Sequence, residues 1–167
     1  KGYKKEFITY GVSPKNLCYP KDIWLNGLKS EYTCMLVNRE LGRVRLNIPG
    51  IHNVVNSLSV ILAGLELGIG FNRVAESISN YKGALRRFEI KSEKNGIMIV
   101  EDYAHHPTEI SATISSGRLL NFNRIIGVFQ PHRYSRTKFL AKEFGKSLSA
   151  LDKVILTDIY AASEKPL

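Results

Sequence analysis

The stretch EDYAHHPTE, residues 101–109, concentrates the chemically versatile side chains of the chain. It follows the apolar run of residues 97–100 and precedes a helical pattern of apolar residues over 110–120. Pro107 suits the first helical position, where a missing N–H has no cost, and Glu109 falls in the first turn, where the helix dipole favours a carboxylate. We therefore predict a turn from strand to helix at the carboxyl end of a strand, which is where ligands bind in an open α/β sheet.

The histidines support the interpretation of this stretch as a site. Taken one at a time, Asp102 is explained as well by capping a turn, and each histidine by an ordinary polar surface. The combination favours function, because every histidine lies in a short polar cluster that borders an apolar run. The four are His52, His105, His106 and His132.

The composition is that of a globular protein with anionic partners. The 167 residues suffice for one ordinary domain or two small ones, and a hydrophobic content of 44% suffices for a core. The formal net charge of +9 favours nucleic acid, nucleotides or phosphorylated metabolites as partners. No apolar run approaches the roughly 20 residues that cross a bilayer, and residues 1–5 show neither a signal peptide nor an initiator methionine. We expect a cytoplasmic protein, a piece of a longer one, with Cys18 and Cys34 as reduced thiols.

The first half of the chain is predicted to be short strands and turns followed by two helices. The strands are expected over residues 7–12, 23–28, 31–37 and 43–48. A helix then runs from about residue 50 to a glycine stop at Gly68, and a second covers residues 72–81 with Asn72 as its N-cap. The apolar periodicity lapses over residues 82–89, which we predict to be a domain boundary.

The second half alternates strands with helices. Strands are expected over residues 88–92, 97–100, 124–129 and 153–157, and helices over residues 107–120 and 137–151. This alternation predicts right-handed βαβ units and a parallel sheet that helices cover on both faces.

A second polar cluster, GIHNVVN, occupies residues 50–56 at the start of the first predicted helix. Asn53 and Asn56 are three residues apart, so their carboxamides would share one helix face. Each carboxamide offers a donor and an acceptor, a combination that suits the edge of a nucleotide base. Alternatively, Asn53 is simply the N-cap of the helix.

A third cluster, QPHRYSRT, occupies residues 130–137, again between a predicted strand and a predicted helix. It should therefore lie at the same sheet edge as residues 101–109. Arg133 and Arg136 can each grip a carboxylate or phosphate through two parallel hydrogen bonds, and the N–H groups at the helix start would add to that grip. Residues 158–160 add an acid and a phenol to the edge. The alternative is that both arginines are solvated loop residues.

The order of these motifs resembles that of the Mur ligases. The motifs are GIHNVVN at residues 50–56, RRFE at 86–89, DYAHHPTE at 102–109 and FQPHRYSRT at 129–137, and the resemblance runs from about residue 7 to the end. Members of the family have an N-terminal UDP-substrate domain, a central ATPase domain and a C-terminal Rossmann-like domain.

The resemblance implies an α/β fold made of parts of two domains. Residues 1–87 would be the C-terminal part of the central ATP-binding domain, with strands plus two helices. Residues 88–167 would be the N-terminal part of the Rossmann-like, parallel-sheet domain. Neither a Gly-Lys-Thr nor a Gly-Lys-Ser motif of the family's phosphate loop is expected anywhere in the sequence, and the family's magnesium ligands would also lie outside this piece.

Carried over motif by motif, the resemblance implies two groups of site residues. Those at ATP would be His52, Asn53 and Asn56, with the two asparagines at the adenine, and Arg87 and Asp102 at the ribose. Those around alanine and the muramoyl carboxylate would be Tyr103, His105, His132, Arg133, Tyr134 and Arg136, with His105, Arg133 and Arg136 catalytic. No residue is expected to bind a metal. Ile51 stands where many relatives carry a basic residue, and no role follows for it.

The activity implied for the parent protein is ATP-dependent amide formation in peptidoglycan precursor synthesis. ATP, with Mg²⁺, would phosphorylate the carboxylate of UDP-N-acetylmuramate, and the amine of L-alanine would attack the acyl phosphate. That activity serves cell wall biogenesis, cell shape and cell division, with no nucleic-acid or membrane partner, and this piece alone should be inactive without the missing parts of its own chain.

Two alternatives stay open. One is a murein peptide ligase of the same family, which shares a version of the His-His-Pro segment but is not expected to carry His-Arg-Tyr-Ser-Arg. The other is a non-catalytic basic α/β module that binds nucleotides or nucleic acid, although the aromatic residues form no RNA-binding motif.

Overall fold

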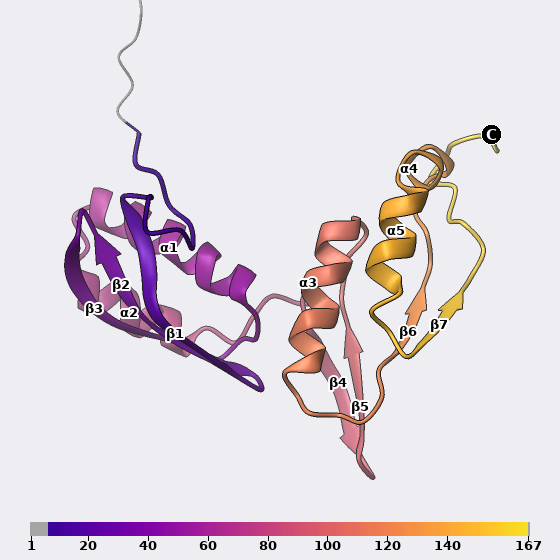
Figure 1. Cartoon of the computed structure of the whole chain (residues 1–167), viewed down its shortest axis with the longest axis horizontal. Helices are drawn as coiled ribbons and strands as arrows, with labels where there is room; N and C mark the ends of the chain where they lie inside the picture. The colour runs from indigo at the N-terminus through magenta and orange to yellow at the C-terminus, as the bar shows by residue number, and fades with distance from the viewer. Residues whose placement is uncertain (1–6, 167) are drawn as a thin grey trace, which may run out of the picture. The chain divides into compact units, whose positions relative to one another are not determined.

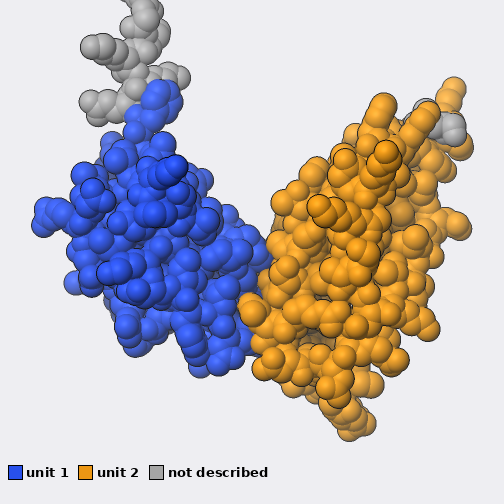
Figure 2. All heavy atoms as spheres, in the orientation of Figure 1, with its two compact units in different colours: residues 1–82 blue, residues 83–167 orange. Residues whose placement is uncertain are grey.

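Figure 1 shows the elements of the computed structural model, which describes residues 7–166. The chain divides into two compact units, residues 1–82 and residues 83–167, which Figure 2 colours separately. The division falls at the start of residues 82–89, where the apolar pattern lapses. Within the described range, no helix is both long and apolar enough to cross a membrane.

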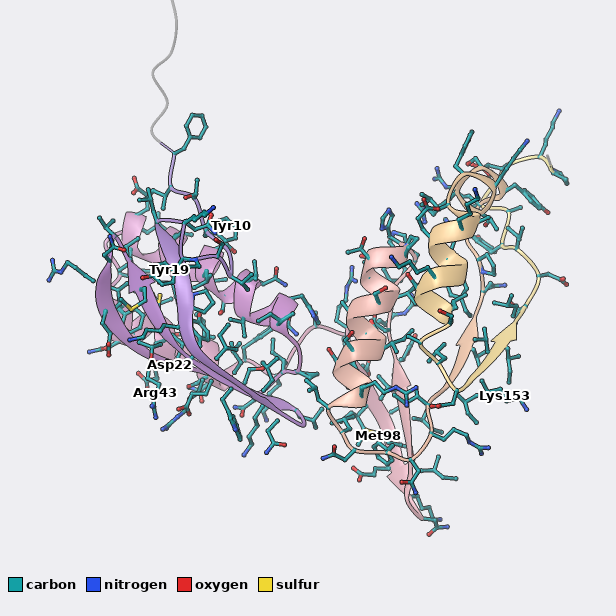
Figure 3. The ribbon with its side chains drawn as sticks, in the orientation of Figure 1. Tyr10, Tyr19, Asp22, Arg43, Met98 and Lys153 are labelled. Atoms are coloured by element: carbon teal, nitrogen blue, oxygen red, sulfur yellow. The ribbon has the colours of Figure 1, made fainter. Side chains whose placement is uncertain are left out.

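Unit 1 holds a three-stranded antiparallel sheet and two helices. The strands are β1 (Cys18–Asn26), β2 (Lys29–Leu36) and β3 (Arg39–Leu46), in the order β1-β2-β3. The loop between β2 and β3 has Val37 at φ 49° and Asn38 at φ 58°, as a two-residue hairpin turn of type I′ requires. On β3, Arg43 extends from the sheet (Figure 3), where its guanidinium pairs with Glu31 at 2.9 Å.

The helices of unit 1 are α1 (Ile51–Glu66) and α2 (Phe71–Asn80). Their buried side chains pack on one face of the sheet, and the cluster comprises Cys18, Tyr32, Cys34, Val44, Leu46, Val54, Leu58, Ile61, Val74 and Ile78. The Tyr32 hydroxyl meets Ser57 Oγ of α1 at 2.6 Å, which satisfies both buried hydroxyls. Both cysteines are free and buried, as expected of reduced thiols.

Two local predictions for unit 1, and one of the alternatives, were wrong. Residues 7–12 form no strand; Tyr10 makes an isolated bridge with Cys18 at the start of β1, and the large apolar side chains of the segment stay exposed. The N-caps of α1 and α2 are Gly50 and Gly70. Asn72, the predicted cap of α2, and Asn53, the alternative cap of α1, therefore lie inside their helices.

Unit 2 contains two pairs of strands and three helices. The strands are β4 (Glu89–Lys94), β5 (Ile97–Glu101), β6 (Ile126–Phe129) and β7 (Lys153–Leu156). The helices are α3 (Pro107–Arg118), α4 (Tyr134–Phe139) and α5 (Ala141–Leu148). Helices α3 and α5 lie side by side (Figure 1), and Ser111 Oγ of α3 donates to Ser147 Oγ of α5 at 2.9 Å.

The α/β class of unit 2 is confirmed, but its details differ from the prediction. β6 and β7 are parallel, as βαβ units require, whereas β4 and β5 form an antiparallel hairpin because only Asn95 and Gly96 separate them. Among the described residues no ladder joins β5 to β6. The buried cluster of Ile110, Ile114, Phe144 and Leu148 comes from α3 and α5 together.

Helices were predicted on both sheet faces, and the described residues provide them on one. Ile97 and Ile99 of β5 remain 66% and 56% exposed, and Ile126 and Val128 of β6 remain 46% and 70% exposed. Each pair is two residues apart, so each occupies one strand face. Those faces therefore have no helix over them in this part of the chain.

Candidate functional site

The turn that leads from β5 into α3 has the predicted local structure. Pro107 is the first residue of α3 and His106 is its N-cap. His106 Nδ1 accepts a hydrogen bond from Thr108 N at 3.4 Å, and Glu109 Oε2 accepts one from His106 N at 3.1 Å, which completes a capping box. Glu109 Oε2 also accepts from His105 N at 3.0 Å, so one carboxylate orders both histidines.

Glu109 also fixes one of the predicted ribose-binding residues. Its Oε1 lies 3.3 Å from Arg87 Nη1, and its Oε2 lies 3.5 Å from His105 Nδ1. Burial acts to raise the pKa of the Glu109 carboxyl, but hydrogen bonds from the backbone N–H groups of His105 and His106 and from Arg87 outweigh it and lower that pKa below its usual value. The carboxylate form is therefore the one that holds this turn.

Asp102 closes the turn at its other end. Its Oδ2 accepts from Phe88 N at 2.9 Å and its Oδ1 accepts from Ala104 N at 2.8 Å. Asp102 thus links the start of unit 2 to the end of β5. This is the turn-capping role that was the alternative to a ribose contact. Each carboxylate oxygen keeps a second lone pair, so the ribose contact stays a prediction.

Tyr103 is the centre of a small cationic cluster. The guanidinium carbons of Arg86 and Arg87 lie 4.9 Å and 5.7 Å from its ring centroid. The His105 ring meets it edge-on, with centroids 5.1 Å apart. Arg86 is held in turn by Glu101, at 2.8 Å. The phenol is therefore fixed between two cations and an imidazole.

The two predicted clusters of unit 2 lie together. The rings of His105 and His132 are 6.5 Å apart, and the rings of His132 and Tyr160 are 5.3 Å apart. Tyr160 belongs to the segment after β7, at the edge where residues 158–160 were expected. Three strand ends therefore contribute to one candidate site.

We call residues 130–137 the arginine loop. Helix α4 begins within it at Tyr134, a half-buried residue, and Arg133 is its N-cap with φ 71° and ψ 135°. Among residues 7–166, Arg136 Nη1 and His132 Nδ1 are buried atoms without a hydrogen-bond partner. Buried polar atoms are nearly always hydrogen-bonded, so these two atoms are open to a hydrogen bond from or to a water molecule or a polar ligand.

One expectation for the arginine loop was wrong. The N–H groups at the start of its helix were expected to be open to an anion, but Ser135 N donates to Glu164 Oε2 at 2.9 Å and Ser135 Oγ donates to Glu164 Oε1 at 2.6 Å. Sequence reasoning missed Glu164 altogether, because 29 residues separate it from its partner.

In unit 1, the candidate residues lie in the first turns of α1. Asn53 Nδ2 donates to the Pro49 carbonyl at 2.7 Å, which leaves Asn53 Oδ1 as an acceptor. Asn56 is exposed one turn further on, and His52 is half-buried beside them. The two carboxamides share a helix face, as predicted from their spacing.

Two further features concern the binding of metal ions and phosphate groups by the described residues. No group of three or more His, Cys, Asp or Glu residues in the described range could bind a metal ion. The sequence also contains a Gly-Lys-Ser string at residues 145–147, contrary to the expectation that it has none. The string lies inside α5 and not in a loop after a strand, so it is no phosphate loop.

Comparison with known proteins places these features in a family. Residues 86–166 match the family described as "Mur ligase, glutamate ligase domain". The chain is 44% identical over 165 residues to the UDP-N-acetylmuramate–L-alanine ligase of Trichlorobacter lovleyi, in a match that covers 98% of this chain and 36% of that protein. The chain therefore spans little more than a third of that relative's length.

Two solved structures of ligases are also similar to this chain. The crystal structure of the UDP-N-acetylmuramate–alanine ligase of Thermotoga maritima superposes with a TM-score of 0.79 at 28% identity, covering 92% of this chain and 34% of that one. A murein peptide ligase from Psychrobacter arcticus superposes with a TM-score of 0.54 at 18% identity, covering 90% of this chain and 38% of that one. The second likeness shows the fold alone.

Proposed function

The chain belongs to the Mur ligase family, and on that premise we propose that it is a piece of an ATP-dependent ligase that joins L-alanine to UDP-N-acetylmuramate. The observation that carries the proposal is the 44% identity to such a ligase, which extends over 98% of the chain and so over both units. The murein peptide ligase is the weaker candidate, because its likeness at 18% identity concerns the fold.

We further propose the domain assignment that the resemblance implies. Residues 1–87 would end the central ATP-binding domain, and residues 88–167 would begin the Rossmann-like domain. The start of the family match at residue 86 and the division into compact units after Lys82 support this assignment.

The proposed reaction has two steps. The muramoyl carboxylate attacks the γ-phosphate of ATP, which releases ADP and gives an acyl phosphate. The alanine amine then attacks the acyl carbon, phosphate leaves, and an amide remains. Negative charge on the acyl phosphate and on the tetrahedral intermediate has to be offset in both steps.

Arg133 and Arg136 are the groups we assign to that charge. Arg136 has a buried nitrogen without a partner among the described residues, and a bidentate contact with a carboxylate or an acyl phosphate would satisfy it. His132, with its own unpartnered Nδ1, and Tyr134 would line the same site.

His105 has the geometry of a general base. Its Nδ1 lies 3.0 Å from the Tyr103 carbonyl oxygen, which can only accept, so in the neutral ring Nδ1 carries the proton and Nε2 carries the lone pair. Nε2 can then take a proton from the ammonium of alanine before the amine attacks. Tyr103 would wall the site beside it.

ATP is a substrate in this proposal, and its adenosine end is the part that this chain would bind. Asn53 Oδ1 and the exposed Asn56 amide offer an acceptor and donors for the adenine edge, with His52 beside them. Arg87 and Asp102, on unit 2, would meet the ribose hydroxyls. The described residues do not fit Mg²⁺, whose ligands we assign to the missing parts of the chain.

The test is a ligation assay on the parent protein. We expect phosphate release from ATP that depends on both L-alanine and UDP-N-acetylmuramate, and a product heavier by one alanyl residue. Use of a free murein peptide in place of alanine would favour the murein peptide ligase. Salt-dependent binding of a generic oligonucleotide, without preference for ATP, would favour a basic binding module instead.

We infer the cellular setting from the same proposal. A ligase that acts on nucleotide-linked precursors would work in the cytoplasm and supply cell wall biogenesis, and through it cell shape and cell division. Neither a nucleic acid nor a membrane is needed as a partner.

A further inference from the structure

Glu164 makes a two-point contact with the arginine loop. Both of its carboxylate oxygens accept from Ser135, Oε2 from the backbone N–H at 2.9 Å and Oε1 from Oγ at 2.6 Å. Its own backbone N–H donates to Ala161 O at 3.0 Å across a tight turn. The turn places Ala162 at φ 48° and Ser163 at φ 70°, a region that L-residues rarely adopt. The chain thus takes up an uncommon backbone conformation where it delivers this carboxylate.

A second uncommon backbone conformation lies on the other side of the contact. Arg133 has φ 71° and ψ 135°. Its N–H donates to Tyr160 O at 2.8 Å, and Tyr160 N donates to Pro131 O at 2.8 Å, which forms a short parallel bridge. Arg133 is therefore held between two anchors, the Tyr160 bridge before it and the Glu164–Ser135 contact after it.

We infer that Glu164 is a positioning residue that keeps Arg133 and Arg136 in place before substrate binds. A non-glycine residue stays in such a backbone region only where its surroundings over-determine it, and the direction of the Arg133 side chain follows from that backbone. Arg136 is the residue next to Ser135 and is fixed with it. The inference rests on the proposed function, because it concerns the grip of these arginines on the substrate.

The contacts of Glu164 indicate that it positions the arginine loop through hydrogen bonds and not through a direct ion pair with Arg133 or Arg136. Hydrogen bonds from the Ser135 side chain and then from its backbone lower the pKa of the Glu164 carboxyl, and the positive charge of Arg133 lowers it further, so the group stays ionised near neutral pH. None of the ion pairs in the described part of the chain involves Arg133 or Arg136. Glu164 thus orders the loop through its hydrogen bonds to Ser135, and Arg133, whose charge acts on Glu164, forms no direct ion pair with it.

The experiment uses the full-length parent enzyme and its Glu164→Ala, Glu164→Gln and Ser135→Ala variants. Glu143→Ala is the matched control, because Glu143 is an exposed glutamate of α5 in the same unit. Amide hydrogen exchange is measured without ligands over residues 130–140 and over Pro107–Arg118. We expect roughly tenfold faster exchange in the first segment of Glu164→Ala and no change in the second. The control should change neither.

Steady-state kinetics give the functional arm. In Glu164→Ala, kcat/KM for UDP-N-acetylmuramate should fall about 10- to 100-fold while KM for ATP changes less than twofold, since a small misplacement of a positioning group costs that much. Glu164→Gln keeps one acceptor oxygen and should recover part of the loss. Ser135→Ala keeps the backbone bond and should show a smaller loss, which also covers the case that Glu164→Ala folds poorly.

The results of these experiments distinguish the positioning role of Glu164 from the proposed ligase function. Unchanged exchange over residues 130–140 in Glu164→Ala overturns the inference, whatever the kinetics. Faster exchange with unchanged kcat/KM overturns it as well, because the loop would then be ordered without consequence for substrate. A parent protein that ligates no alanine contradicts the proposed function, and faster exchange in its Glu164→Ala variant would still support the contact between Glu164 and the loop.

Discussion

Arg136 is the residue whose removal should affect the reaction most directly. It offers a buried Nη1 without a partner among the described residues, so substrate is the expected partner. Losing one charge-assisted bidentate contact should cost about 2 to 4 kcal/mol, or roughly 30- to 1,000-fold in kcat/KM. Arg136→Lys should recover only part of this, because an ammonium keeps the charge but not the planar fork.

The measurement is steady-state kinetics of the parent enzyme at saturating ATP, for Arg136→Ala and likewise for Arg133→Ala. Arg73→Ala on the exposed side of α2 serves as the control. An efficiency within threefold of wild type, or a change confined to KM for ATP, would show that the arginines do not grip the carboxylate.

Glu109 should make the stability of the chain depend on pH. Because folding lowers its pKa, the contribution of Glu109 is full above the unfolded value of about 4.3 and is lost as pH falls through the folded value. Glu109→Gln should therefore reduce the free energy of unfolding at pH 7, by about 1 kcal/mol, because a neutral amide loses the pair with Arg87 and the charge-assisted strength of the backbone hydrogen bonds. The difference from wild type should shrink below pH ~4. Urea denaturation at both pH values measures it, and equal differences at both would contradict this account.

Local sequence rules identified the residues that cap α3, but they did not identify the contact between Glu164 and the arginine loop. Pro107 and Glu109 follow from helix-start rules, because the capping contacts at this turn reach at most four residues along the chain. The Glu164 contact spans 29 residues and joins two polar side chains, which leave no periodic pattern in the sequence. For Asp102, the residue type suited both a cap and a ligand, and only the structure showed its two backbone bonds.

At the scale of elements, two glycines should respond to alanine in opposite directions. A Cβ on Gly64 of α1 would lie 2.6 Å from Val74 Cγ2 of α2, so the helices would have to separate. A Cβ on Gly145 of α5 would meet nothing within 4 Å. We expect Gly64→Ala to destabilise the chain by about 1–3 kcal/mol, and Gly145→Ala to stabilise it by about 0.5–1 kcal/mol through helix propensity. Denaturant unfolding tests both, and a stabilising Gly64→Ala would disprove the close crossing.

The element that sequence described least well is the helix predicted over residues 137–151. It begins earlier, at Tyr134, and breaks at Leu140, whose φ is −111°. No glycine or proline marks the break. Leu140 packs with the buried cluster of unit 2 while Phe139 stays 79% exposed. The packing of Leu140 against the buried cluster therefore accompanies the break between α4 and α5. Helix propensity does not predict a break of this kind, because it depends on the residue type and not on tertiary contacts.

At the scale of the molecule, unit 2 leaves apolar surface that its own described residues do not cover. A cleft of about 730 Å³ is lined by β5, α3 and β6, between two strand pairs that no ladder joins. Together with the exposed isoleucines of β5 and β6, this surface is larger than scattered apolar residues explain. The alternation of strands and helices therefore predicted the α/β class and the parallel pair of β6 and β7, but not the antiparallel hairpin of β4 and β5 or the open sheet face.

The division of the site across a longer chain leads to a prediction about activity. The residues of the proposed site are assigned to adenosine, alanine and the muramoyl carboxylate as a proposal, whereas the sequence has no glycine-rich phosphate loop and the described residues hold no metal site. Phosphoryl transfer depends on positioning and charge stabilisation at the γ-phosphate, so the 167-residue chain should release no phosphate from ATP above background. The assay compares this chain with the parent protein at equal concentration, with and without L-alanine and UDP-N-acetylmuramate. Phosphate release by the chain alone that requires both substrates would mean that the residues described here suffice for catalysis, and the Gly-Lys-Ser string of α5 would then have to be reconsidered as a phosphate contact.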